Sequence, residues 1–156
     1  MARILIVGYG NPLRSDDGVG VRAAERLLQG PLPPGTEVLP RHQLTPDLAD
    51  AIQHSDLVIF VDAARGGIPG ELRCAPVDAA TQAAPFTHEL TPSSLMSLVT
   101  VLYGISPPAF EVSMGGECFG LGDRLSPAVA DALPDLVAFL GQKLGEQFQP
   151  AHHALA

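Results

Sequence analysis

Apolar runs alternate with segments of helical periodicity along the first half of the chain. Residues 4–7 and 57–61 are continuous apolar runs, which are typical of strands covered on both faces of a sheet. Residues 36–41 form a shorter extended run between them, and residues 18–28 and 45–54 carry apolar positions at helical spacing. This strand–helix–strand–helix–strand order predicts an α/β protein with a parallel sheet.

The second half of the chain continues the alternation with less regular spacing. In order, we expect a weak strand at 71–77, an irregular stretch at 78–92, a helix from Ser93, a strand at 109–114 and a final helix from about 126 to 147. Pro134 falls within the final helix and is expected to kink or split it, because proline lacks the amide hydrogen that a helix interior needs. We expect a single domain over residues 1–149 and a disordered tail over residues 150–156.

The expected strand order places two acidic residues near one another. If the sheet begins in the order 2-1-3, the strands at 3–7 and 57–61 are neighbours, and their carboxyl ends meet at one edge. Asp17 follows the first of these strands and Asp62 ends the other. Ligands bind at this edge in open α/β sheets, so we expect a site there.

The loop after the first strand is rich in glycine and carries two adjacent carboxylates, Asp16 and Asp17. Leu13 stands where a dinucleotide-binding fingerprint needs its third glycine, and no Gly-Lys-Ser/Thr follows for a phosphate-binding loop. An acidic loop suits a cation or a positively polarised group instead. We expect one of the two aspartates to cap the following helix and the other to be free for function.

Composition narrows the possible partners. The formal net charge is −8 and the sequence pI is about 4.9, which disfavours nucleic-acid binding. No apolar run approaches the length of a membrane span, and no leader of charged then apolar residues opens the chain, so we expect a soluble, cytoplasmic protein. Cys74 and Cys118 are the two cysteines, and both are expected to be buried free thiols in strands.

Asp62 ends an apolar strand and therefore needs a partner for its charge. Arg65 could fill that role, and so could a metal ion. Carboxylates combined with histidine suit nickel or zinc, and His88 in the irregular stretch and His42 after the second strand are the candidates among five histidines. No Gly-x-Ser-x-Gly motif is present, which disfavours an α/β-hydrolase.

These motifs together resemble one known family, the maturation endopeptidases of nickel–iron hydrogenases. The resemblance covers most of the chain, and its most specific part is the Gly-x-Gly-Asn…Asp-Asp-Gly-x-Gly pattern. It rests on the segments Gly8-Tyr9-Gly10-Asn11-Pro12-Leu13, Asp16-Asp17-Gly18-Val19-Gly20, Val61-Asp62-Ala63, Thr87-His88, Gly120-Leu121 and Leu125-Ser126-Pro127.

The resemblance implies a three-layer α/β/α sandwich with a five-stranded, mostly parallel sheet. It implies an endopeptidase that removes the C-terminal peptide of a hydrogenase large-subunit precursor after nickel insertion. Asp17, Asp62 and His88 match the family's metal-binding and catalytic positions, whereas Asp16 and Asn11 match positions that look structural. The nickel would belong to the precursor or bind transiently, and the free protein is expected to be a monomer.

Two other functions remain open from the sequence. The chain could be a small metallohydrolase that acts on another peptide or ester. It could also be a non-enzymatic chaperone that senses metal in a metalloenzyme precursor. The absence of an evident nucleophile favours attack by water in either hydrolase.

Overall fold

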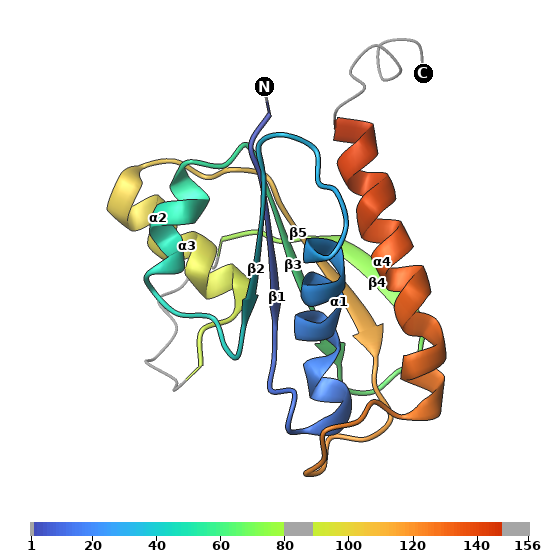
Figure 1. Cartoon of the computed structure of the whole chain (residues 1–156). Helices are drawn as coiled ribbons and strands as arrows, with labels where there is room; N and C mark the ends of the chain where they lie inside the picture. The colour runs from blue at the N-terminus through green and yellow to red at the C-terminus, as the bar shows by residue number, and fades with distance from the viewer. Residues whose placement is uncertain (1, 80–88, 148–156) are drawn as a thin grey trace.

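The computed structural model describes residues 2–79 and 89–147, and its centre is a five-stranded sheet (Figure 1). The strands lie in the order β2 (Thr36–Arg41), β1 (Ile4–Tyr9), β3 (Leu57–Ala64), β5 (Ala109–Gly115) and β4 (Leu72–Pro76). Neighbouring strands are parallel except β4, which is antiparallel to β5. The predicted 2-1-3 start and the mostly parallel sheet are both confirmed.

Helices cover both faces of this sheet, as the sandwich architecture requires (Figure 1). α1 (Val19–Leu28) and α4 (Pro127–Gln147) pack on one face, and α2 (Leu48–Gln53) and α3 (Pro92–Tyr103) pack on the other. A short 3₁₀ turn, η1 (Ser15–Gly18), leads into α1. The expected tail at 150–156 lies outside the described residues.

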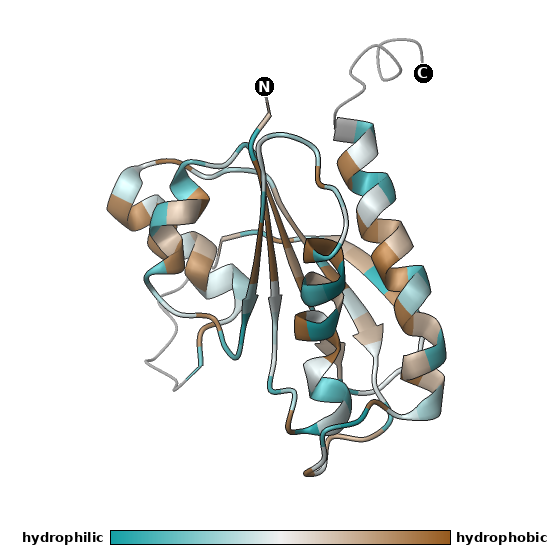
Figure 2. Ribbon diagram, in the orientation of Figure 1, coloured by the Kyte–Doolittle hydropathy of each residue, from teal (hydrophilic) through white to brown (hydrophobic). Residues whose placement is uncertain are grey.

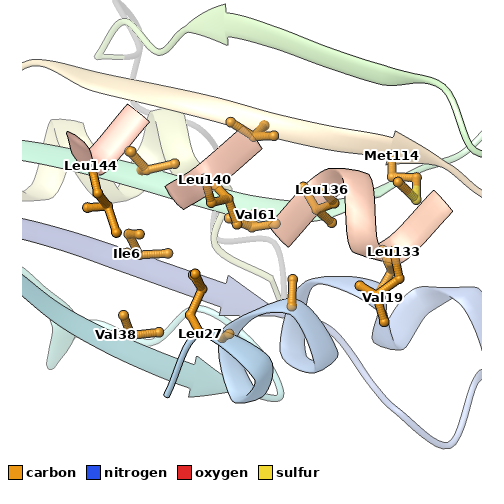
Figure 3. Close-up of a cluster of buried hydrophobic side chains, with 14 of the residues drawn as sticks. Ile6, Val19, Leu27, Val38, Val61, Met114, Leu133, Leu136, Leu140 and Leu144 are labelled. Carbon is orange, nitrogen blue, oxygen red and sulfur yellow. The ribbon is translucent and has the colours of Figure 1, made fainter. Parts of the chain in front are cut away.

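Two apolar layers hold the helices to the sheet, and the central strands β1 and β3 are apolar along most of their length (Figure 2). Successive strand residues point to opposite faces, so Ile6 belongs to one layer and Val7 to the other. Figure 3 shows the first layer, in which α4 contributes a row of leucines that faces Val19 and Leu27 of α1. This packing places the start of α1 at the carboxyl edge of the sheet.

The final helix is not split at Pro134, contrary to one of the two expected outcomes. α4 runs from Pro127 to Gln147 with Pro134 inside it. Pro134 is exposed, whereas Leu133 and Leu136 beside it are buried. The apolar burial along α4 therefore outweighs the cost of one missing backbone hydrogen bond, about 3 kcal/mol.

Two further expectations need correction. β3 continues to Ala64, so Asp62 lies inside the strand and not at its end. Cys74 and Cys118 are both exposed, because β4 is an edge strand and Cys118 lies in the loop after β5. Within the described ranges, no helix is long and apolar enough to cross a membrane.

Candidate functional site

Glycines bring the first loop close to the sheet. A side chain on Gly20 would place its Cβ 2.2 Å from the Val61 carbonyl oxygen, and one on Gly8 would lie 2.1 Å from the Gly20 oxygen. Gly10 has a φ of +137°, and its Cβ would lie 1.9 Å from the Asp17 carbonyl oxygen. The glycines of the motif therefore allow the start of α1 to pack directly on β1 and β3, which brings Asp17 to the edge that carries Asp62.

Asp17 is half-buried in this loop and has a structural contact of its own. Its Oδ2 accepts a hydrogen bond of 2.8 Å from the Asn11 backbone nitrogen. The Asn11 side chain in turn accepts a 2.9 Å hydrogen bond from the Leu13 nitrogen, so Asn11 stabilises the turn as the resemblance implied. The expectation that one aspartate would have no structural contact is therefore wrong.

Asp16 is fully buried, and it holds a distant loop where a helix cap was expected. Its Oδ2 accepts hydrogen bonds from the Glu117 and Cys118 nitrogens and from the Ser126 hydroxyl, and its Oδ1 accepts one from the Ser126 nitrogen. Burial alone would raise the pKa of Asp16, but these bonds together lower it below its ordinary value. Its side chain caps neither η1 nor α1.

Asp62 has one oxygen that is bonded and one that is not. Its Oδ2 accepts a 2.9 Å hydrogen bond from the Tyr9 hydroxyl. Its Oδ1 is buried and has no hydrogen-bond partner among residues 2–79 and 89–147. The suggested partner Arg65 stacks on another side chain instead: its guanidinium carbon is 4.3 Å from the centre of the Phe119 ring. That suggestion was wrong, and Oδ1 is a buried acceptor available to another group.

Electrostatics at this edge favour a bound cation. Burial, together with the charges of Glu111 and Asp17, raises the pKa of Asp62 to about 7, against the opposing hydrogen bond from Tyr9. Burial also raises the pKa of Glu111. The charges of Glu111 and Asp17 thus oppose the ionisation of Asp62 in a partly buried space, and a positive ion would relieve that repulsion.

A cavity of about 510 Å³ opens at the carboxyl edge next to the first loop. Asp17 and Tyr9 line it together with His42, Arg65 and Glu89. His42, one of the two histidines that the sequence suggests as candidates, therefore shares this cavity with Asp17. His88 lies outside the described residues, so its predicted place in the site is not examined by the structure.

The arrangement fits two carboxylate ligands of a cation. The unpartnered Asp62 Oδ1 and the neighbouring charge of Asp17 are the features that support this fit. Among residues 2–79 and 89–147, no three His, Cys, Asp or Glu side chains lie close enough together to hold a metal ion. His88, which the resemblance implies as a third ligand, lies outside these ranges.

The sequence analysis missed Tyr9 and Glu111 as parts of the site. Tyr9 was noted only as a variable position of the glycine motif, and Glu111 lies in β5 opposite Phe60. Both become relevant through the strand register, which places them beside Asp62. A correct strand alignment could have found them, but local sequence carries no signal for either.

No protein-family model and no curated protein matches the chain. Solved structures do match it. The chain is 28% identical to a [NiFe] hydrogenase maturation protease HycI from Thermococcus kodakarensis KOD1, with a TM-score of 0.75 over 92% of this chain and 93% of that one. It is 25% identical to the hydrogenase maturating endopeptidase HybD from E. coli, with a TM-score of 0.80 over 93% of both chains.

A third structure, the solution structure of an endopeptidase from Escherichia coli, is 21% identical with a TM-score of 0.74 and supports the fold. These comparisons confirm the sandwich architecture, the predicted resemblance and the predicted enzyme class. Over 92–93% of its length, the chain is similar to the maturation endopeptidases of nickel–iron hydrogenases.

Proposed function

We propose that this chain is an endopeptidase that removes the C-terminal peptide from a nickel–iron hydrogenase large-subunit precursor after nickel insertion. The likeness to the two maturation proteases supports a protease role in hydrogenase maturation. The single observation that carries the metal-dependent part is the buried, unpartnered Oδ1 of Asp62 in an acidic cluster. A cation that arrives with the substrate would supply the missing partner of this buried oxygen.

In this proposal the nickel is part of the substrate, and the chain supplies oxygen and nitrogen ligands to it. Asp17 and Asp62 contact the ion from the sheet edge, and His88 completes the set. A precursor without nickel offers no ion for these side chains, so it binds poorly and is not cleaved. The dependence of cleavage on completed nickel insertion follows directly.

Water is the attacking group in this proposal. The residues that line the cavity in the described part of the chain include no serine and no cysteine. A nickel ion held against the precursor can serve for recognition alone, or it can also polarise the scissile carbonyl. The chain's own contribution in both forms is to bind and orient the precursor's metal-bearing end.

The test is incubation of the purified chain with nickel-loaded and with nickel-free precursor, followed by mass spectrometry of the products. Cleavage of the loaded precursor alone supports the proposal. Cleavage of generic peptides would identify a broader metallohydrolase, and binding of the loaded precursor without cleavage would identify a chaperone.

Matched variants locate the activity in the molecule. Asp17→Asn is expected to abolish cleavage, because it removes a charge at the site with almost no change of shape. Asp131→Asn makes the same chemical change on the exposed surface of α4 and is expected to cleave like the unmodified chain. Equal activity of the two variants would remove Asp17 from the site.

A further inference from the structure

Tyr9 and Asp62 lie side by side on neighbouring strands. β1 and β3 are parallel, and the pair Gly8 and Val61 is followed directly by Tyr9 and Asp62. Side chains at paired positions point to the same face of a parallel sheet. Tyr9 packs against the apolar layer under α2 and α3, so its ring is held in place.

The hydroxyl of Tyr9 has one hydrogen to donate, and it donates that hydrogen to Asp62 Oδ2 at 2.9 Å. Burial, together with the charge of Asp62, raises the pKa of Tyr9 far above its ordinary value, so the hydroxyl remains a donor. The bond fixes one oxygen of the carboxylate, while the buried Oδ1 has no partner in the part of the chain that the structure describes.

We propose that Tyr9 is a positioning residue, which turns Asp62 so that Oδ1 is the oxygen presented to the precursor's nickel. The inference rests on the proposed function for the identity of the ion. It adds that Asp62 Oδ1 is the atom in contact with the ion, and that Tyr9 determines which oxygen of Asp62 makes this contact. Carboxylate ligands of metals are commonly held in this way by hydrogen bonds to their second oxygen.

A purely structural tyrosine would lead to a different expectation. Its hydroxyl would stabilise the fold, and its loss would lower stability without affecting the orientation of Asp62. In the observed arrangement the Tyr9 hydroxyl donates the one hydrogen bond that the Asp62 carboxylate accepts within the described residues. Its loss should therefore free the Asp62 side chain while the ring continues to fill its place in the core.

The test compares Tyr9→Phe with Tyr103→Phe. These are the chain's two tyrosines, and Tyr103 lies at the end of α3, partly exposed. Thermal unfolding is measured first, and both variants are expected to unfold within about 4 °C of the unmodified chain. The χ1 angle of Asp62 is then measured by NMR coupling constants. A single rotamer is expected in the unmodified chain and in Tyr103→Phe, and averaging over rotamers is expected in Tyr9→Phe.

Kinetics with nickel-loaded precursor provide the second measurement. Tyr9→Phe is expected to lower kcat about 10–100-fold, with KM changed less than about threefold, whereas Tyr103→Phe leaves both unchanged. A fixed Asp62 rotamer in Tyr9→Phe would overturn the inference. So would a large loss of thermal stability with Asp62 still ordered, since that would identify a structural hydroxyl.

The two proposals fail in different ways. If the unmodified chain does not cleave loaded precursor, the proposed function is wrong, but the NMR comparison still decides whether Tyr9 orients Asp62. If the unmodified chain cleaves loaded precursor and Tyr9→Phe cleaves it equally well, the proposed function stands and the positioning role of Tyr9 is overturned.

Discussion

Asp16 accepts two hydrogen bonds from Ser126, a residue 110 positions away in the chain. The Ser126 nitrogen donates to Oδ1 and its hydroxyl donates to Oδ2, both at 2.8 Å. The bonds tie the start of η1 to the residue that precedes α4. The loop between β5 and α4 therefore lies against the first loop at the carboxyl edge (Figure 1). The buried carboxylate next to Asp17 thus supports the site without belonging to it.

Asp16→Asn is expected to lower the free energy of unfolding by about 3 kcal/mol at pH 7, because an amide nitrogen would face the backbone donors that the carboxylate now accepts. Urea denaturation measures this loss, and Asp131→Asn on the exposed surface of α4 is the control. The pKa of Asp16 is lowered in the folded state, so its contribution is present above its ordinary value of 3.8 and is lost as the pH falls through the folded value. The free energies of unfolding of Asp16→Asn and of the unmodified chain should therefore become similar in strong acid. An unchanged stability of Asp16→Asn at pH 7 would contradict this role.

Asp62→Asn is expected to keep the fold and to gain stability in alkaline solution. Burial raises the pKa of Asp62 to about 7, above its ordinary value of 3.8, so the folded state binds the proton more tightly than the unfolded state. The stability that this group contributes is complete below about pH 3.8 and is lost as the pH rises through 7. Asp62→Asn has no such loss. Its free energy of unfolding should exceed that of the unmodified chain by about 1–2 kcal/mol at pH 8, after allowance for partial exposure to solvent.

Urea denaturation of both proteins between pH 5 and pH 8 measures this difference. The free energies of unfolding of the two proteins should be similar at pH 5 and should differ at pH 8. A lower stability of Asp62→Asn across the whole range would show that the charge of Asp62 stabilises the fold. The same variant is expected to lose cleavage of nickel-loaded precursor, and retained processing would remove Asp62 from the metal-binding role.

The isolated chain is expected to bind nickel only weakly, with a dissociation constant in the micromolar range or above. Two carboxylates and one histidine, without thiolates, make a looser site than four protein ligands do. Titration calorimetry with nickel, and then with nickel-loaded precursor, measures both steps. Nanomolar binding by the isolated chain would indicate a resident ion and would contradict a substrate-borne one.

Gly20→Ala is expected to disrupt the loop that carries Asp17, because its Cβ would lie 2.2 Å from the Val61 carbonyl oxygen. The backbone must move to relieve that contact, which should cost several kcal/mol and should abolish cleavage. Gly141→Ala in α4 is the matched control, since nothing lies within 4 Å of its added Cβ. That change should stabilise the protein by about 0.5–1 kcal/mol. Thermal unfolding of both variants checks the prediction, and a harmless Gly20→Ala would contradict the close packing.

The sequence by itself determined the architecture and the edge at which a site would form. Continuous apolar runs identified the buried strands, and helical spacing identified the segments that cover them, because burial on a strand or a helix imposes a period that is visible locally. The order of elements then indicated that β1 and β3 are neighbours, which the structure confirmed. The glycines of the first loop were visible as a motif. The sequence did not show why glycine is needed there, which is the close contact of Gly20 with Val61.

Only the tertiary structure decided which atoms meet at that edge. The partner of Asp62 is Tyr9, 53 positions away, and not the nearby Arg65. Asp16 anchors a loop more than 100 positions away, where local sequence suggested a helix cap. These contacts depend on strand register and on the path of a loop across the sheet. Such long-range geometry leaves no periodic signal in the chain, so it could not be predicted from the pattern of residues alone.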